Sequence, residues 1–266
     1  MRTNNKYKTV KNWNVSRCED FSGIFYGCNI SDIKPLESWN VSNGINFYEI
    51  FAENLISDIT LFEKWDLSNA ENLGSLFAYC KNIIDITPIQ NLNLSKCENL
   101  LGLFSHCKNL SDISPIKNWD VSNVENFSYM FNGCPLISDL RPIEKWNVSK
   151  GTDFMMMFWG CGISDINPIK NWNVSNGKDF SYMFACCSLI SNLKPLENWN
   201  VSNCTNFSDM FACLELLTDV SPLKKWNVSN GKEFGGMFSQ CKSLKNGNIL
   251  KNWKFSKKTD FKSMFE

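Results

Sequence analysis

The sequence predicts an α/β repeat solenoid of ten stacked units, each with a short strand and a short helix, and with a parallel sheet on one side. Three regularities support this prediction. A tryptophan recurs every 26 or 27 residues, a phenylalanine follows each tryptophan position after twelve residues, and a serine follows it after three. One such unit cannot bury both its helix and its strand, whereas stacked units share a continuous core. We therefore expect residues 1–266 to form one solenoid domain.

The register holds along the whole chain, with Leu92 replacing the tryptophan of the fourth unit. The tryptophans are Trp13, Trp39, Trp65, Trp119, Trp146, Trp172, Trp199, Trp226 and Trp253. The phenylalanines twelve residues later are Phe25, Phe51, Phe77, Phe104, Phe131, Phe158, Phe184, Phe211, Phe238 and Phe265. A loop that is one residue shorter in three units accounts for the two spacings. Residues 1–12 are predicted to be a degraded N-terminal strand and residues 244–266 an atypical last repeat.

The first half of each unit has the spacing of an amphipathic helix. In the fifth unit, Phe127, Met130, Phe131 and Cys134 stand at i, i+3, i+4 and i+7, which is one face of an α-helix. The recurring serine, Ser122 in this unit, would be its N-cap, and in four units a glutamate stands three residues further on, as in a capping box. Glycines at the end of the pattern would stop the helix.

The second half of each unit is predicted to be extended. Its pattern, I-S-D-[IL]-x-P-[IL], is too short for a helix and contains a proline that forbids helix continuation. We expect a short strand there, followed by a turn that leads through W-N-V-S into the next helix.

These motifs resemble the BspA-type leucine-rich repeats. The run F-x-x-C-x-x-[IL]-S-D-[IL]-x-P, followed by W-N-V-S-N-x-x-x-F-x-x-M-F, covers nearly the whole chain and is closest to a variant of mycoplasmas, other bacteria and giant viruses. The resemblance implies a right-handed leucine-rich-repeat-like solenoid that is exposed at a cell surface or contacts a host. It implies no catalytic residues, because the motif is a packing motif.

Composition and charge exclude some functions. Lys+Arg and Asp+Glu both number 27, so the chain lacks the positive charge that nucleic acid or anionic lipid would require. We expect no nucleic-acid partner and no membrane span, because no stretch approaches roughly 18 apolar residues. The first residues lack the apolar core of a signal peptide. The sequence alone thus indicates a cytoplasmic protein, whereas the resemblance indicates a cell surface, and the compartment stays unknown.

Cysteine recurs at one position in seven units: Cys28, Cys80, Cys107, Cys134, Cys161, Cys187 and Cys241. Asn54 and Leu214 interrupt this ladder, so we expect small buried thiols rather than disulfides. A zinc site needs convergent ligands. The adjacent Cys186 and Cys187 and the single histidine, His106, do not provide them, so we expect no metal and no cofactor.

Two further ladders of polar residues are predicted to be structural. One consists of Asp32, Asp58, Asp85, Asp112, Asp139, Asp165 and Asp219, completed by Asn192 and Asn246. We expect these side chains to accept turn N–H groups, with binding of Ca²⁺ or of a cationic partner as the alternative. The residue after each tryptophan is usually Asn, and we expect it to cap loop backbone. The tryptophans themselves are expected to form the core between repeats.

Catalysis requires differentiated residues, whereas a repeat distributes the same residues everywhere. His106 and Cys107 are adjacent in sequence, and adjacent helix positions point apart. No phosphate-binding loop, dinucleotide-binding fingerprint or nucleophile elbow is present. We therefore predict that the protein is not an enzyme.

The positions that vary between units are the candidate binding surface. Most are small or polar, but the fifth to seventh units carry five large side chains: Tyr129, Met155, Met156, Trp159 and Tyr182. Aromatic residues and methionine on an exposed face are typical of protein interfaces. We predict that these five bind a protein partner, and packing against a neighbouring loop is the alternative. The neighbouring Phe154, Met157, Phe158 and Cys161 occupy the four inward positions and are predicted to be core.

The leading interpretation is therefore a non-enzymatic protein–protein interaction scaffold. The alternative is a structural or self-assembling protein that associates end to end. Each solenoid end needs a polar cap, yet the chain closes on Phe255, Phe261, Met264 and Phe265.

Overall fold

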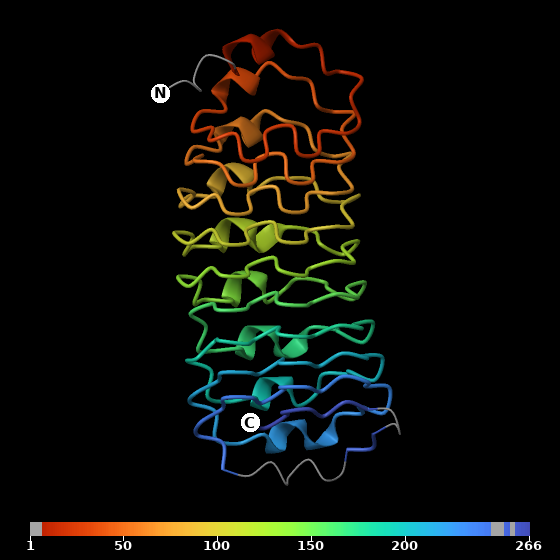
Figure 1. Cartoon of the computed structure of the whole chain (residues 1–266). Helices are drawn as coiled ribbons and strands as arrows, with labels where there is room; N and C mark the ends of the chain where they lie inside the picture. The colour runs from red at the N-terminus through yellow and green to blue at the C-terminus, as the bar shows by residue number, and fades with distance from the viewer. Residues whose placement is uncertain (1–6, 246–252, 256–258) are drawn as a thin grey trace.

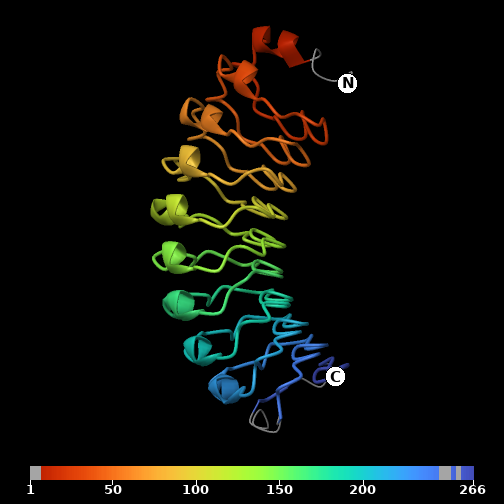
Figure 2. The same ribbon diagram turned by 90° about the vertical axis from the view of Figure 1, so that its left-hand side faces the viewer.

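The computed structural model describes residues 7–245, 253–255 and 259–266. They form a stack of coils in which the chain advances one repeat per turn from one end to the other (Figure 1). Seen from the side, the stack is curved, with short helices along its convex edge (Figure 2). The repeat solenoid predicted from the sequence is thus the observed architecture.

The helices of the convex edge are all short 3₁₀-helices. They are η1 Tyr7–Asn12, η2 Lys34–Leu36, η3 Thr60–Glu63, η4 Thr87–Ile89, η5 Ser114–Asn118, η6 Arg141–Ile143, η7 Asn167–Asn171, η8 Lys194–Leu196 and η9 Ser221–Lys225. Except for η1 and η3, which contain no proline, these are the segments around the recurring proline, so a helix stands where the end of a strand was predicted. The reason is local: proline fixes φ at a helical value and fits the first turn of a helix. The predicted N-terminal strand is likewise wrong for Tyr7–Asn12, which is η1.

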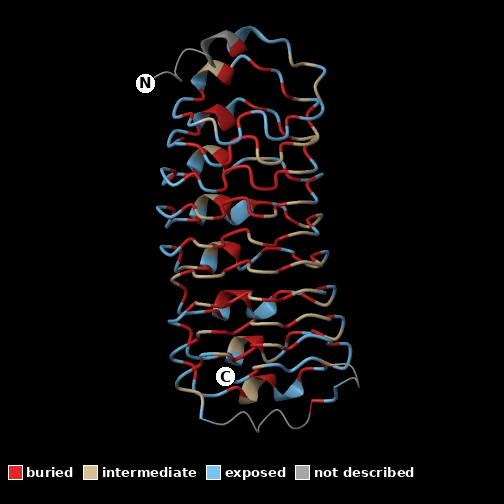
Figure 3. Cartoon of the chain, viewed as in Figure 1, coloured by how far each residue is buried: buried red, intermediate tan, exposed pale blue. Residues whose placement is uncertain are grey.

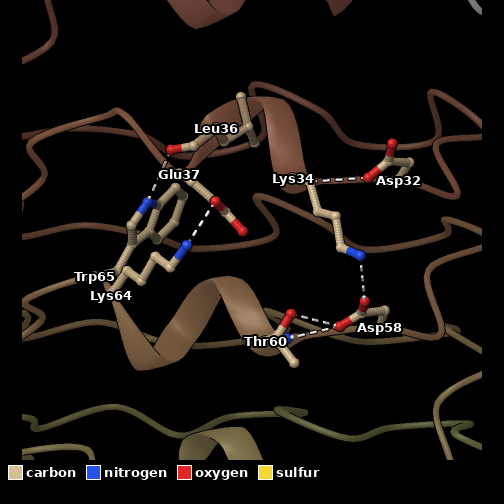
Figure 4. A network of polar contacts seen from close by, with 8 residues as sticks. All are labelled: Asp32, Lys34, Leu36, Glu37, Asp58, Thr60, Lys64 and Trp65. Carbon is tan, nitrogen blue, oxygen red and sulfur yellow. Dashed lines mark hydrogen bonds and ion pairs between the residues drawn. The ribbon is translucent and has the colours of Figure 1, made fainter.

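The aspartate ladder opens these helices, as predicted. Asp32 Oδ1 accepts the N–H of Lys34 at 2.9 Å, and Asp58 Oδ1 accepts the N–H of Thr60 at 3.0 Å (Figure 4). The same bond recurs in the later units that the structure describes. Asn192 makes it as well as Asp, so the oxygen matters more than the charge. The structural role of this ladder is confirmed, except at Asn246, which lies outside the described residues.

The Asn or Asp that follows the tryptophan position in the first nine units also caps backbone, as predicted. Asn40 Oδ1 accepts the N–H of Ser42 at 3.1 Å, and Asp120 Oδ1 accepts that of Ser122 at the same distance. The recurring serine therefore donates its N–H to a turn and is not the N-cap of a helix. The expected capping boxes are absent from the described residues for the same reason, and Glu125 uses its backbone oxygen to accept Thr152 N–H of the next unit.

The segment predicted to be an α-helix is instead a run of tight turns. In the fifth unit it spans residues 127–134, and we call this eight-residue stretch the turn segment of each unit. Three N–H groups bond three residues back within the segment, as in Met130 N–H to Phe127 O at 3.3 Å. The alternate N–H groups bond to the next unit, as in Tyr129 N–H to Met155 O at 2.8 Å. An α-helix would keep all of these bonds inside the segment.

Two residues of each complete turn segment, the third and the seventh, have the left-handed backbone conformation. In the first unit these are Gly23 (φ 62°) and Gly27 (φ 61°), and in the fifth they are Tyr129 (φ 58°) and Gly133 (φ 68°). Hydrogen-bonded turns that have φ above zero at their third residue favour glycine there. Repeated reversal of the chain places positions 1, 4, 5 and 8 on the inside. Positions 1, 4, 5 and 8 have the spacing i, i+3, i+4 and i+7, from which the sequence predicted an α-helix.

The parallel sheet is reduced to a ladder of single bridges. They join the residue before each turn segment to its equivalent in the next unit, from Asp20↔Asn46 to Glu233↔Asp260. Among the described residues there is no longer strand and no α-helix. Most bridge residues also accept an N–H two residues on, as Asn126 Oδ1 does from Ser128 at 2.9 Å. Parallel pairing on one side is therefore observed, but the strand-plus-helix detail is not.

Buried residues recur in coil after coil of the stack (Figure 3), and the core that they form contains stacked rings and thiols beside isoleucine, leucine and valine. Phe131 and Phe158 stack with ring centroids 5.9 Å apart, and each tryptophan of the 26–27-residue register from Trp39 to Trp253 is at most 5% exposed. Each of these indoles donates Nε1–H to a carbonyl of the preceding unit, for example Trp65 to Leu36 O at 3.2 Å (Figure 4). The prediction that tryptophan is core is confirmed, except for Trp13, which is 54% exposed.

The cysteine ladder is likewise a row of buried free thiols from Cys80 onward. Cys134 Sγ donates to Phe104 O of the preceding unit at 3.0 Å, and Cys161 does the same to Phe131 O at 3.1 Å. Asn54 replaces cysteine in the second unit and donates Nδ2–H to Phe25 O at 2.7 Å. Either side chain therefore supplies a donor to the same carbonyl, which explains why both occur in this ladder.

The curvature follows from unequal spacing through the thickness of the stack. Backbone hydrogen bonds hold the turn segments at the spacing of paired strands, roughly 4.8 Å. The stacked tryptophan rings behind them have centroids 6.2–6.4 Å apart. The turn segments therefore form the concave edge, and the 3₁₀-helices spread along the convex edge (Figure 2).

Leu92 leaves a gap where the other units place an indole. A hollow of about 360 Å³ lies beside it, lined by Phe62, Trp65, Leu67 and Pro88 among others. We expect Leu92→Trp to raise the free energy of unfolding by about 1 kcal/mol, because it restores the repeat without overpacking. Thermal unfolding followed by circular dichroism measures this change. A lower melting temperature would mean that Phe62 already fills the space of the missing ring.

The buried thiols predict a loss of stability at alkaline pH. Burial raises the pKa of Cys134 and of Cys187 from the ordinary 9.0 to about 12. The folded state thus keeps protons that the unfolded chain loses, so this contribution is complete below pH 9 and is lost as the pH rises towards 12. We expect the melting temperature to fall above pH 9, and less steeply in Cys134→Ala. Parallel curves for the two proteins would contradict this.

Candidate functional site

The concave face is built from the outer positions of the turn segments, which are the second, third, sixth and seventh. Positions 1, 4, 5 and 8 point into the core, and the other four lie on the concave side, although small side chains there, such as Ser128 and Ala185, are buried. Because successive segments are hydrogen-bonded in register, equivalent outer side chains form rows along the stack. The sequence of these rows, rather than the shared repeat, distinguishes one region of the face from another.

The five residues predicted from the sequence lie together on this face, in three consecutive units. Met155 is at a second position, Trp159 at a sixth, and Tyr129, Met156 and Tyr182 at third positions. All five are half-buried. We call these five residues the Met–Trp patch. Their neighbours Phe154, Met157, Phe158 and Cys161 are buried, which confirms the division between core and surface in this region.

Three members of the patch have a backbone conformation that favours glycine. Tyr129, Met156 and Tyr182 have φ values of 58°, 53° and 57°, whereas Gly23, Gly102 and Gly236 occupy the same position in other units. A side chain in this conformation costs on the order of 1 kcal/mol relative to glycine. The fifth to seventh units thus place large side chains on the concave face at a cost in backbone strain.

Polar groups surround the patch. A hydrogen bond with Asp209 raises the pKa of Tyr182, and burial adds to this. Burial also raises the pKa of Tyr129 and of Asp153, the bridge residue of the sixth unit. The patch is therefore an apolar surface that remains uncharged at neutral pH apart from the carboxylates at its border.

A second feature of the concave face is a groove over the first five units that the sequence reading missed. It has a volume of about 310 Å³, and we call it the tyrosine groove after Tyr26, Tyr79 and Tyr129. Its lining also includes the small residues Ala52, Ser75, Ala78, Gly102 and Ser105. The sequence signal for the groove was the contrast between Trp159 and the small residues Ala52, Ala78 and Ser105, which hold the same sixth position in the second to fourth units. Its meaning depended on knowing that equivalent positions form rows.

The walls of the groove carry specific polar contacts. Tyr26 Oη donates to Glu53 Oε1 at 2.8 Å. Tyr79 stacks on the ring of His106 with centroids 4.5 Å apart and an angle of 15°. Burial lowers the pKa of His106, and the nearby Lys108 and Lys81 lower it further, so this imidazole is neutral at pH 7.

His106 and Cys107 point in different directions. The thiol of Cys107 is in the core and donates to Phe77 O at 3.2 Å, whereas His106 lies on the concave face. Cys187 is also a core thiol, and its neighbour Cys186 is half-buried on the concave face. Burial and the adjacent Cys213 raise the pKa of Cys186 to about 11. Within the described residues, no three His, Cys, Asp or Glu side chains converge as metal ligands.

No helix in the described part of the chain is long and apolar enough to cross a membrane.

Comparison with known proteins gives a family match over the whole chain. A family described as "Mycoplasma protein of unknown function, DUF285" matches residues 1–111, 73–191 and 162–266. No curated protein matches the sequence. The mycoplasma element of the expected resemblance is thereby confirmed, whereas the BspA-type assignment stays a prediction.

Two solved structures of Listeria monocytogenes proteins are similar to this chain. One is internalin C2, with a TM-score of 0.34 and 16% identity over 77% of this chain and 76% of that chain. The other is described as "Functional domain of InlJ from Listeria monocytogenes includes a cysteine ladder". It has a TM-score of 0.29 and 15% identity over 85% of this chain and 55% of that chain. The present chain thus spans about half the length of the InlJ chain.

Proposed function

The chain belongs to the DUF285 family of mycoplasma proteins of unknown function, and we propose that it is a non-enzymatic scaffold that binds a protein partner through its concave face. The observation that carries this proposal is the Met–Trp patch. Five large side chains gather on one outer surface of a repeat whose other units place mostly smaller or polar residues there. Solenoids present extended concave surfaces for binding, and aromatic and methionine side chains are enriched in protein interfaces.

All ten units have the left-handed conformation at the third position of the turn segment, and only the fifth to seventh units place a large apolar or aromatic side chain there. Glycine at the positions of Tyr129, Met156 and Tyr182 would relieve the left-handed conformation without opening the core, because these positions face outward. Strained residues that a fold could avoid tend to occur at functional sites. Methionine adds a flexible, polarizable surface that adapts to a partner.

The resemblance to BspA-type repeats extends this proposal to location. We propose that the solenoid is displayed at a cell surface, where its concave face contacts another protein, including one of a host. The proposal that the protein is not an enzyme rests on the even distribution of polar residues. Three of the recurring polar positions serve backbone N–H groups, at Asp32, Asn40 and Asn46 and their equivalents.

The patch can be tested with two pairs of substitutions. We expect Met155→Ser/Trp159→Ser to keep the melting temperature within a few degrees and to lose partner binding by at least tenfold, since central apolar anchors dominate interface energy. Affinity capture of proteins that bind the wild-type solenoid, quantified for each variant, measures this loss. The matched control is Leu136→Ser/Leu189→Ser, which removes two leucines, each 51% exposed, outside the patch.

Two results would contradict the proposal. If Met155→Ser/Trp159→Ser unfolds the protein, these side chains belong to the core and the packing alternative holds. If the leucine control loses the same partners, the binding is not specific to the Met–Trp patch.

A second candidate function, assembly of copies end to end, is favoured by exposed rings in the first and last units. Trp13 is 54% exposed and stacks on Trp39, and Phe261 and Phe265 are 40% and 47% exposed. If these rings stack on another copy, the mass measured by light scattering rises with protein concentration. A constant monomer mass of 30.6 kDa at every concentration would contradict assembly.

A further inference from the structure

The tyrosine groove has the chemistry of a site for a cation. Glu49 and Glu53 line it in the second unit, and the rings of Tyr26, Tyr79 and Tyr129 line it from the first to the fifth. Carboxylates attract a positive group directly, and the face of an aromatic ring attracts it through the ring quadrupole. Three of the buried residues that line the groove, Ala52, Ser75 and Ala78, are small and uncharged.

Among the residues that the structure describes, no Lys, Arg or His forms an ion pair with Glu49 or Glu53. The ion pairs of the described residues join other groups, such as Lys34 to Asp58 and Lys64 to Glu37 along the convex edge (Figure 4). Glu53 accepts the hydroxyl of Tyr26 at 2.8 Å, which holds the carboxylate in place without neutralising it. His106, the ring that stacks on Tyr79, is neutral at pH 7. The acidic end of the groove is therefore uncompensated within the described structure.

Asn132 gives an independent indication of a ligand. It lines the groove, is only 7% exposed, and its Oδ1 is buried with no hydrogen-bond partner within the described structure. Its Nδ2 lies 3.2 Å from Ser105 Oγ and 3.3 Å from His106 Nε2. A buried acceptor without a donor costs about 1–3 kcal/mol. A ligand that brings an N–H donor into the groove would remove this cost.

The backbone again carries strain at the residues that define the groove. Glu49, Glu53 and Tyr79 have φ values of 56°, 59° and 61°, at positions where glycine would be unstrained. As in the Met–Trp patch, the chain keeps large side chains in a conformation that favours glycine. Here the retained groups are two carboxylates and a ring, which together suit a cation.

The shape of the groove selects among cationic ligands. It runs across four unit-to-unit steps of roughly 4.8 Å each, or about 19 Å, which is the length of about six residues of extended peptide. Its carboxylates lie only towards one end, and its other end is lined by Leu101, Tyr129 and Asn132. A ligand with a single positive group and an uncharged remainder matches this distribution. A polyamine, which is charged at both ends, does not.

We propose that the tyrosine groove binds a lysine side chain carried on an extended peptide segment of a protein partner. The ammonium group lies against the carboxylates of Glu49 and Glu53 and the ring faces of Tyr26 and Tyr79. Peptide N–H groups run towards Asn132. This site goes beyond the proposed function, since it shares only Tyr129 with the Met–Trp patch and can operate if that patch binds nothing.

Titration followed by nuclear magnetic resonance tests the site directly. The probe is an acetylated and amidated six-residue peptide of alanine and serine with one central lysine. Its control has norleucine in place of lysine, which keeps the length and removes the charge. We expect the lysine peptide to shift the amide signals of Gly102 and Ser105 and to bind at least tenfold more tightly than the norleucine peptide at low salt.

Matched variants assign the binding to the groove. We expect Glu49→Gln/Glu53→Gln to weaken binding of the lysine peptide at least tenfold. Glu63→Gln/Glu144→Gln, at the ends of η3 and η6 on the convex edge, removes two exposed carboxylates outside the groove and should have no effect. We also expect Met155→Ser/Trp159→Ser to bind the peptide normally, so failure of the Met–Trp patch and failure of the groove give different results.

Three outcomes would overturn the proposal. Equal affinity for the lysine and norleucine peptides would show that no ammonium group is recognised. Equal weakening by Glu63→Gln/Glu144→Gln and by Glu49→Gln/Glu53→Gln would show attraction by overall charge only. Tighter binding of spermidine than of the lysine peptide would show a site for free polyamines rather than for a protein segment.

Discussion

The turn segments impose the constraint on which the rest of the structure depends, because their backbone cannot satisfy itself. Within residues 127–134, three N–H groups bond inside the segment, four bond to the next unit, and that of Ser128 bonds to Asn126 Oδ1. A single unit would leave half of these donors to water, so the stacked arrangement is required by the hydrogen bonds as well as by the core. The N–H groups thus alternate between bonds inside the segment and bonds to the next unit. The left-handed residues make this alternation possible, because each closes a tight turn that reverses the chain.

The other ladders follow from that stacking. Once the units are in register, the indole Nε1–H of each core tryptophan and the thiol of each ladder cysteine from Cys80 onward meet a carbonyl of the preceding unit, as Trp146 meets Ile116 O at 3.2 Å. Aspartate and asparagine side chains satisfy the N–H groups of the remaining turns locally. The repeated polar residues are thus committed to backbone, which leaves the outer positions of the turn segments as the surface that can vary without harm to the fold.

Function in such a molecule depends on departures from the repeat. The Met–Trp patch and the tyrosine groove lie next to each other on the concave face and share Tyr129, yet they differ in chemistry. The first is apolar and large, and the second combines small residues with rings and carboxylates. Both keep bulky side chains at left-handed positions, where glycine would cost less and is present in some of the other units. A partner that covered both regions would meet an apolar anchor site beside an acidic one.

The sequence by itself determined the number of units, their register, the core residues and the capping role of two polar ladders. These features depend on spacing alone, and spacing is visible in the chain. It also placed the five residues of the Met–Trp patch on one surface. The type of local structure could not be derived in the same way, because positions 1, 4, 5 and 8 face inward both in an α-helix and in this run of turns.

Only the tertiary structure decided between those two conformations, since half of the hydrogen bonds in question go to the neighbouring unit. Glycine at Gly23, Gly27, Gly102 and Gly133 was the sequence signal for the turns, but serine, tyrosine and glutamate occupy the same positions elsewhere and obscure it. The tyrosine groove was hidden for a related reason. Its residues come from five units. They become one surface only when stacking places successive units about 5 Å from each other.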